Sequence, residues 1–161
     1  MEKFQEARAR AKKSLKVADH MLTITYPLVQ DPKLLLAVLE NIFIALTNSM
    51  AAILYYERLF KRIPPFHDTF ESKFNVFSAD VSKKYKFDPS YIRLIMDVKN
   101  LILEHKKSPV EFSRDNKFVI CSDKYDIKTI SEDQLKEYVK KTKLFIQEMT
   151  NMVSKDESLF R

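Results

Sequence analysis

The sequence predicts a mainly α-helical protein, an up-and-down bundle of four to five helices with a small β-hairpin inserted before the last helix. Apolar residues recur at steps of three and four along most of the chain, as on the buried face of a helix. Two Asp-Pro pairs mark helix starts. The 161 residues include no glycine, which disfavours hairpins with two-residue Asn-Gly turns and favours helices joined by turns that contain Pro and Asp.

Length and composition predict one domain over residues 1–153, with the hairpin insertion at about 109–130 and a frayed tail at 154–161. A domain of this size buries about two-thirds of the surface of its unfolded chain, so it needs no disulfide or metal to fold. The single cysteine, Cys121, suits a reducing compartment, and the charged N-terminal stretch differs from a secretory signal. We therefore expect a cytoplasmic protein that is not in a membrane.

The first helix is expected over about residues 3–26, with Pro27 at its end. Its apolar positions share one stripe: Phe4, Ala7, Ala11, Leu15, Ala18 and Leu22. The opposite arc is basic and carries Arg8, Arg10, Lys12, Lys13 and Lys16. These charges are interpreted as a solvated helix face, with a nucleic-acid-binding stripe as the alternative.

The second helix is expected to open at Asp31 and Pro32, which are good residues for the N-cap and the first helical position, and to end at Pro64 and Pro65. Four polar residues at steps of seven share one stripe along it: Asn41, Asn48, Tyr55 and Arg62. This stripe predicts a hydrogen-bonded ladder in the core or a polar seam at a dimer contact, in preference to a ligand site.

The middle of this second helix is apolar enough for a membrane span, because Glu40 is the only charge from Leu34 to Tyr56. Asn41, Asn48 and Ser49 interrupt the run, and a central glutamate is costly in lipid. A helix that is apolar nearly all round also fits the centre of a bundle, which is the interpretation we adopt.

Two further helices are expected at about 68–86 and 89–107, the second opened by Asp88 and Pro89. The apolar positions of the first are Phe70, Phe74, Phe77 and Val81. The apolar face of the second comprises Tyr91, Leu94, Ile95, Val98, Leu101, Ile102 and His105. His105 therefore falls within an apolar stripe.

The β-prone part of the chain lies between residues 109 and 130. The runs "VEF" and "KFVIC" flank the turn-like "SRDN" and predict an antiparallel hairpin, with "DIKTI" as an extra strand or an extended arm. The last helix is expected at about 132–153, behind a capping box of Ser131 and Gln134. Its candidate core residues are Leu135, Tyr138, Val139, Leu144, Ile146 and Met149.

Several classes of chemistry are excluded or disfavoured by residue types. Without glycine the chain has no Walker or dinucleotide-binding phosphate loop and no nucleophile elbow. The three histidines, His20, His67 and His105, lie in different segments and in no metal-binding frame, so we expect no metal site and no cofactor. Cys121 lies in a strand-like run and is interpreted as a structural residue.

A basic cluster surrounds the end of the helix at 89–107 and the hairpin. Its members are Lys99, His105, Lys106, Lys107, Arg114 and Lys117. Cations at a helix C-terminus are favoured by the helix dipole, and the same charges suit a phosphate. Lys106, Lys107, Arg114 and Lys117 are therefore the candidate nucleic-acid-binding residues, in a protein with a net charge of +6.

Long antiparallel helices with a short polar motif near the end of a late helix resemble the HEPN superfamily. The motif there is an arginine, often followed by asparagine, and a histidine after four to six residues. "KNLILEH" matches this frame with Lys99 in place of arginine, followed by Asn100 and His105. The resemblance implies that the histidine transfers protons and the cation supports a phosphate. Lysine lacks the planar fork that binds two phosphate oxygens, which implies a weak or absent nuclease.

We therefore expect a HEPN-like interaction module, RNA-associated and without strong catalytic activity, that forms a homodimer. One alternative is a metal-independent endoribonuclease with His105 as acid and base and with Lys99 and Asn100 at the phosphate. Another is a structural partner of a nucleotidyltransferase or of another protein. These alternatives differ in whether the protein cleaves RNA, binds RNA without cleaving it, or has no affinity for RNA.

Overall fold

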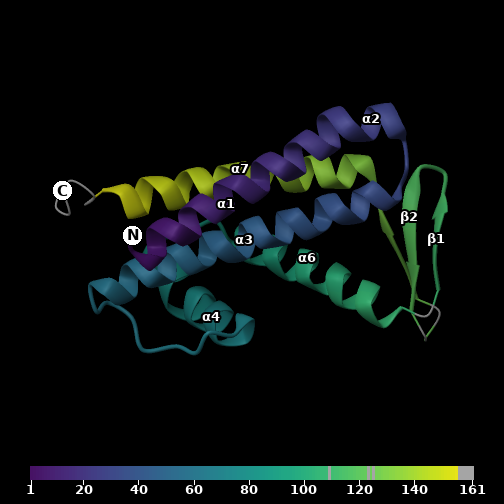
Figure 1. Ribbon diagram of the computed structural model, residues 1–161. Coiled ribbons are helices and arrows are strands. Elements are labelled where there is room, and N and C mark those ends of the chain that lie inside the picture. The colour runs from purple at the N-terminus through teal and green to yellow at the C-terminus, as the bar shows by residue number, and fades with distance from the viewer. Residues whose placement is uncertain (109, 123, 125, 156–161) are drawn as a thin grey trace.

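Helices make up most of the chain, as predicted, with a small sheet at one end (Figure 1). The structure is a computed structural model that describes residues 1–108, 110–122, 124 and 126–155. The helical segments, with two π-helical turns labelled η, are α1 Lys3–His20, η1 Met21–Thr25, α2 Tyr26–Val29, α3 Lys33–Leu59, α4 Phe70–Val76, η2 Phe77–Val81, α5 Ser82–Lys84, α6 Pro89–Lys107 and α7 Glu132–Ser154. The strands are β1 Val110–Arg114, β2 Lys117–Cys121 and β3 Ile127–Ile130. From Asp156 on, the expected frayed tail lies outside the described residues.

The first helical rod is longer than predicted, because Pro27 does not end it. α1 continues through η1 into α2, and the rod ends only at Val29, where Gln30 adopts left-handed backbone with φ 54°. The π turn places Pro27 in the first turn of α2, a position where proline is tolerated. The predicted apolar stripe from Phe4 to Leu22 is buried.

The second rod, α3, lies at the centre of the bundle and packs against α1, α6 and α7. It ends at Leu59, before Pro64 and Pro65, so the predicted end at the prolines is wrong. Lys61 has φ 57° and turns the chain away from the helix axis. Its buried leucines include Leu35 and Leu39, and each such residue contributes about 1.5–3 kcal/mol.

Among the described helices, α3 alone is long and apolar enough to cross a membrane. Half of its most apolar window, 50%, is buried by the rest of the structure. A core helix passes the same test of length and composition, so the test is weak evidence for a span.

The helix predicted at 68–86 comprises α4, η2 and α5, which follow one another without a break. Phe77 and Val81 are buried, as expected. Phe70 and Phe74 are only half-buried, and their rings stack with centroids 5.5 Å apart. This short rod lies beside α3, where Phe70 contacts Phe43, and forms one wall of a groove described below.

The start signals of α6 and α7 act as predicted. Asp88 caps α6, and Ser131 and Gln134 form the capping box of α7. One core prediction for α7 is wrong, since Leu144 is 50% exposed. It lies about 180° around the helix from buried Leu135, while Phe145 on the inner side is fully buried.

The predicted hairpin is part of a three-stranded antiparallel sheet in the order β1-β2-β3, and the "DIKTI" run supplies the third strand. β1 and β2 are joined by a two-residue turn at Asp115 and Asn116, with φ 50° and 59°. Both residue types tolerate this conformation, so the lack of glycine does not prevent such a turn, contrary to expectation. Phe118, Ile120 and Ile130 are buried on the inner face of the sheet.

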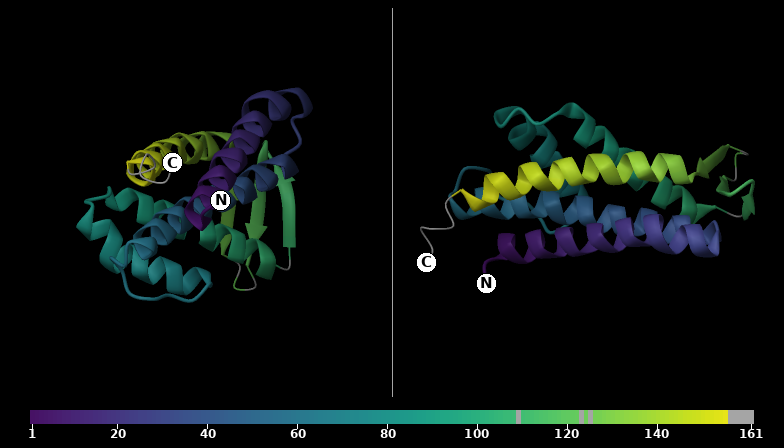
Figure 2. Two further views of the ribbon diagram at one scale, coloured as in Figure 1. Left: turned by 60° about the vertical axis from the view of Figure 1, so that its left-hand side comes forward. Right: turned by 90° about the horizontal axis from the view of Figure 1, so that it is seen from above.

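The sheet lies at one end of the helices, while both termini lie toward the other end (Figure 2). At the sheet end, the Tyr26 hydroxyl of α2 donates a hydrogen bond to the Asn116 carbonyl at 3.3 Å. This hydrogen bond joins the first helical rod to the turn between β1 and β2.

Candidate functional site

The predicted motif residues Lys99, Asn100 and His105 all lie on α6, but they face different neighbours. Lys99 Nζ is 2.9 Å from Glu71 Oε1 on α4. His105 Nδ1 is 2.5 Å from Glu111 Oε1 on β1. Asn100 is exposed. Six residues on a helix separate side chains by about 120° around the axis, so within one chain these groups do not converge.

His105 is neither sealed in the core nor open to solvent. Its side chain is 27% exposed, and its ring meets Phe118 of β2 edge-on with centroids 6.4 Å apart. The contact with Glu111 joins the C-terminal end of α6 to β1. The imidazole thus has a structural partner on each side.

The other predicted binding residues lie at the sheet end of the molecule. Lys106, Lys107, Arg114 and Lys117 are all exposed, and Arg114 Nε is 3.8 Å from an oxygen of Asp115. Across the described residues, no group of three His, Cys, Asp or Glu side chains could hold a metal ion.

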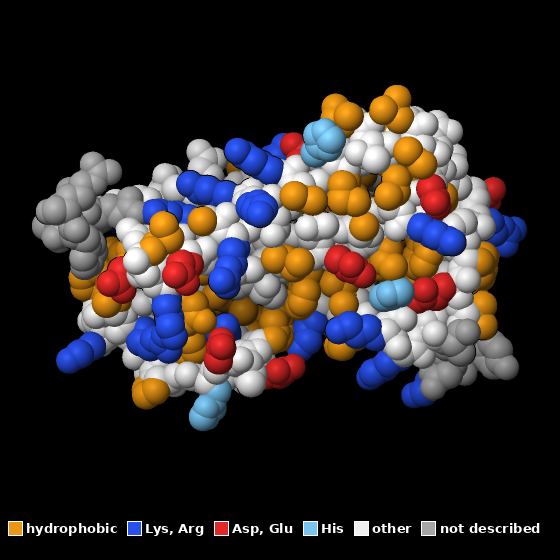
Figure 3. Space-filling model, viewed as in Figure 1, with side chains coloured by type: hydrophobic (Ala, Val, Ile, Leu, Met, Phe, Trp, Pro, Cys, Tyr) orange, Lys and Arg blue, Asp and Glu red, His pale blue; other side chains and the backbone are white. Residues whose placement is uncertain are grey.

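A groove lies between α1, α3 and α4. Its cavity volume is about 540 Å³, within the range typical of ligand pockets. Figure 3 shows this hollow with an apolar floor and basic side chains around it. The lining residues are Lys3, Glu6, Ala7, Arg10, Phe43, Thr47, Asn48, Met50, Ala51, Tyr55, Asp68, Thr69, Phe70 and Lys73.

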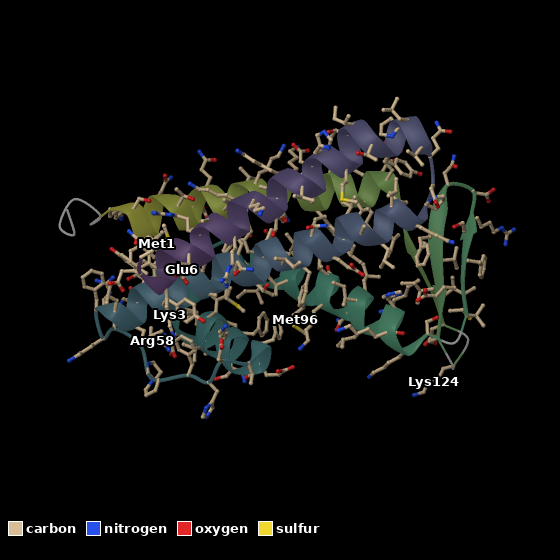
Figure 4. The ribbon with its side chains drawn as sticks, viewed as in Figure 1. Met1, Lys3, Glu6, Arg58, Met96 and Lys124 are labelled. Carbon is tan, nitrogen blue, oxygen red and sulfur yellow. The ribbon has the colours of Figure 1, made fainter. Side chains whose placement is uncertain are left out.

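Tyr55 of α3 lies at one end of the groove, surrounded by cations. Lys3 Nζ, the Arg58 guanidinium carbon and Lys73 Nζ lie 5.6, 4.9 and 5.3 Å from the centre of its ring. The Tyr55 hydroxyl donates a hydrogen bond to Asp68 at 3.3 Å. Figure 4 shows Lys3 and Arg58 together at this end of the molecule, away from Lys124 at the sheet. The face of an aromatic ring attracts cations, so the Tyr55 ring stabilises these three positive charges beside the groove.

Lys73 and Asp68 form an ion pair at 2.5 Å on the α4 side of the groove. Burial opposes the charge of Lys73, but hydrogen bonds to Asp68 and Tyr55 outweigh it and raise the pKa of Lys73. The hydrogen bond and charge of Lys73 lower the pKa of Asp68 in turn. This pair is neutral overall and stays ionised near neutral pH.

Lys3 and Arg10 supply the groove with accessible positive charge. Both are exposed, and neither forms an ion pair with a carboxylate of the described residues. Glu6 is the remaining acid in the lining. The exposed residues Lys12, Lys13 and Lys16 add positive charge farther along α1, and Lys13 lies within about 60° of Arg10 around the helix axis. The groove and this basic face of α1 are therefore suited to an anionic ligand.

Sequence reasoning missed this groove because its residues come from three distant segments. One signal was present: the stripe of polar residues at steps of seven on α3. Asn48 and Tyr55 of that stripe line the groove. Asn41 and Asn48 each donate to a carbonyl of their own helix, at 2.9 and 2.8 Å, and Asn41 also contacts the Met21 sulfur of η1 at 3.9 Å, so the two side chains form no continuous ladder.

No protein-family model, curated protein or solved structure matches the chain. The HEPN resemblance therefore remains a prediction from a short motif.

Proposed function

We propose that the protein is a helical module that binds RNA without cleaving it, through the α1–α3–α4 groove and the basic face of α1. The observation that carries the proposal is the groove of about 540 Å³ bordered by Lys3, Arg10 and the cations around Tyr55. Phosphates of a flexible single strand would lie on these cations, while bases contact the half-buried aromatic walls Phe43 and Phe70.

The distribution of charge favours a polyanion over a small uncharged ligand. The chain carries a net charge of +6, and exposed lysines extend from the groove along α1. A stripe of this kind is the electrostatic footprint expected of nucleic-acid binding. Lysine-rich contacts act as point charges on phosphates, so we expect little base specificity.

The rival function, a metal-independent ribonuclease, is less well supported by the positions of its residues. Lys99 is held by Glu71 and His105 by Glu111, and the two side chains diverge around α6. Catalysis would need a second copy to bring a cation to His105 across a dimer axis. The homodimer, the cytoplasmic location and the HEPN relationship stay predictions.

The test measures binding of a fluorescein-labelled, mixed-sequence single-stranded RNA by fluorescence anisotropy in EDTA. The wild-type affinity should fall steeply between about 50 and 200 mM salt. In the variant Lys3→Gln with Arg10→Gln, Kd should rise about tenfold, which corresponds to about 1.4 kcal/mol. The slope of log K against log salt should become shallower by about 0.7 for each phosphate that the variant no longer neutralises.

The matched control is Lys106→Gln with Lys107→Gln, which removes the same charge at the sheet end. Its Kd should stay close to wild type. A larger loss of RNA affinity in this control than in the groove variant would show that RNA binds at the sheet end instead. No binding at about 50 mM salt would refute the proposal. RNA cleavage that disappears in His105→Ala would establish the ribonuclease instead.

A further inference from the structure

Strand β1 forms an open edge of the sheet at the end of the molecule opposite the termini. The strand order β1-β2-β3 leaves β1 paired on one side only (Figure 1). Unpaired edges of this kind accept further strands, and proteins commonly protect them with charge, bulges or a covering element.

The direction of the free backbone groups follows from the turn. With positive φ at Asp115 and Asn116, the flanking residues Arg114 and Lys117 exchange both hydrogen bonds of a two-residue hairpin. Hydrogen-bonded and non-bonded pairs then alternate along the ladder. The N–H and C=O groups of Glu111 and Ser113 therefore point away from β2, toward solvent.

The outer face beside this edge is apolar and exposed. Val110, Phe112 and Ile127 are 52%, 42% and 66% exposed. A shallow concavity of about 190 Å³ lies between Phe112 of β1 and Ile127 of β3. The edge thus combines free backbone groups with apolar side chains for alternate residues of an added strand.

The charges at both ends of β1 are mainly positive. Lys106 and Lys107 precede the strand, and Arg114 and Lys117 flank its turn. Of the nearby acids, Glu111 contacts His105, and Asp115 lies 3.8 Å from Arg114 and offsets part of its charge. A second copy paired antiparallel would bring the cationic start of one β1 against the cationic end of the other. Like charges would oppose that dimer, whereas acidic residues of another chain would be attracted.

We propose that the β1 edge binds an extended acidic segment of a partner protein as an added strand. The segment carries Asp or Glu near its two ends, beside the cations that flank β1. Its backbone pairs with Glu111 and Ser113, and its alternate apolar side chains contact Phe112. This inference is independent of RNA binding in the groove, because the cations at the ends of β1 do not line the groove.

The experiment selects phage-displayed random dodecapeptides on the immobilised full chain. Selected peptides should carry acidic residues around a central stretch whose alternate residues are apolar, and the synthetic peptide with the strongest enrichment should bind in a salt-dependent manner. Ser113→Pro removes one outward N–H, which an edge strand tolerates, and should weaken this binding at least tenfold. The matched control, Thr129→Pro, removes the corresponding outward N–H of β3 and should bind the peptide normally.

A second readout covers the case in which Ser113→Pro misfolds. In wild-type protein, the peptide should protect the amide hydrogens of Glu111 and Ser113 from exchange. The proposal fails if no acidic peptide is enriched, if these amides stay unprotected in the complex, or if Thr129→Pro is the damaging variant. It also fails if RNA displaces the peptide from the sheet end, or if the β1 edge is occupied by a second copy in sedimentation and exchange experiments.

Discussion

Glu57 is a fully buried carboxylate in the last turns of α3, with an exposed fraction of 0%. Its Oε2 accepts from the Arg62 guanidinium at 2.7 Å, and its Oε1 lies 3.7 Å from Lys84 Nζ. Burial and the charge of Glu57 raise the pKa of Tyr85 to about 12. The carboxylate therefore joins the end of α3 to the following loop and to α5. A buried charge of this kind is stable only while its partners remain.

Replacing Arg62 should destabilise the protein more than replacing both partners. Arg62→Met leaves Glu57 buried beside the half-exposed Lys84 and should cost about 2–3 kcal/mol, below the usual loss for a buried pair because Arg62 is 35% exposed. The double variant Glu57→Gln with Arg62→Met should recover part of this loss, as measured by urea unfolding followed by circular dichroism.

Arg114→Met is the matched control for this prediction, because Arg114 is 76% exposed at the tip of the hairpin. Its free energy of unfolding should change by less than about 0.5 kcal/mol. A double variant less stable than Arg62→Met would show that the Glu57 charge is not the source of the loss.

At the scale of elements, helix ends without glycine are a distinctive feature of this chain. After α3, Lys61 has φ 57° and the N–H of Arg62 bonds to the Glu57 carbonyl. After α5, Lys86 has φ 55° and the N–H of Phe87 bonds to the Ser82 carbonyl. Both ends have the bonding of a Schellman motif, in which glycine is preferred at the left-handed position. Lysine there carries a conformational cost that glycine lacks.

Lys86→Gly should therefore stabilise the protein by about 0.5–1 kcal/mol, because the relief of left-handed strain exceeds the added entropy of the unfolded chain. The matched control is Lys83→Gly, within α5, which should destabilise the protein by about 0.5–1 kcal/mol. Urea midpoints of the two variants should move in opposite directions. Equal shifts of the two urea midpoints would show that the left-handed backbone of Lys86 does not limit the stability of this helix end.

At the scale of the whole molecule, four tyrosines with raised pKa values affect the stability at alkaline pH. Burial raises the pKa of Tyr26, Tyr85, Tyr91 and Tyr138, which lie in four different helical rods or their ends. For Tyr91, burial and then the charge of Glu148 raise the pKa to about 12. In the unfolded chain a tyrosine ionises near pH 10. The neutral hydroxyls therefore favour the folded state.

This stabilisation is fully present below about pH 10 and is lost as the pH rises through about 12, because the unfolded state loses its protons first. The free energy of unfolding should thus fall between about pH 10 and 12. Tyr91→Phe keeps the ring that stacks on Phe145 at 5.0 Å but should show a shallower fall. Urea unfolding at several alkaline pH values measures the slope, and an unchanged slope would contradict the assignment to Tyr91.

Much of the fold could be predicted because its signals are local. Asp88 and Ser131 each bond to a backbone N–H within three residues, so the starts of α6 and α7 appear in short stretches of sequence. The exceptions are also local in origin. Pro27 is accommodated by a π turn, and Asp115 and Asn116 replace glycine in a tight turn. Residue preferences are tendencies, and neighbouring geometry overrides them at these positions.

Short-range residue order accounts for the helices, their caps and the strand runs, since each depends on hydrogen bonds and apolar spacing within a few residues. The groove arises only when residues 3–10, 43–55 and 68–73 pack together, as their rods bury apolar stripes against one another. The same packing directs Lys99 to α4 and His105 to β1, apart from each other. Which polar side chains meet is decided by contacts between distant segments, and these leave little trace in local sequence.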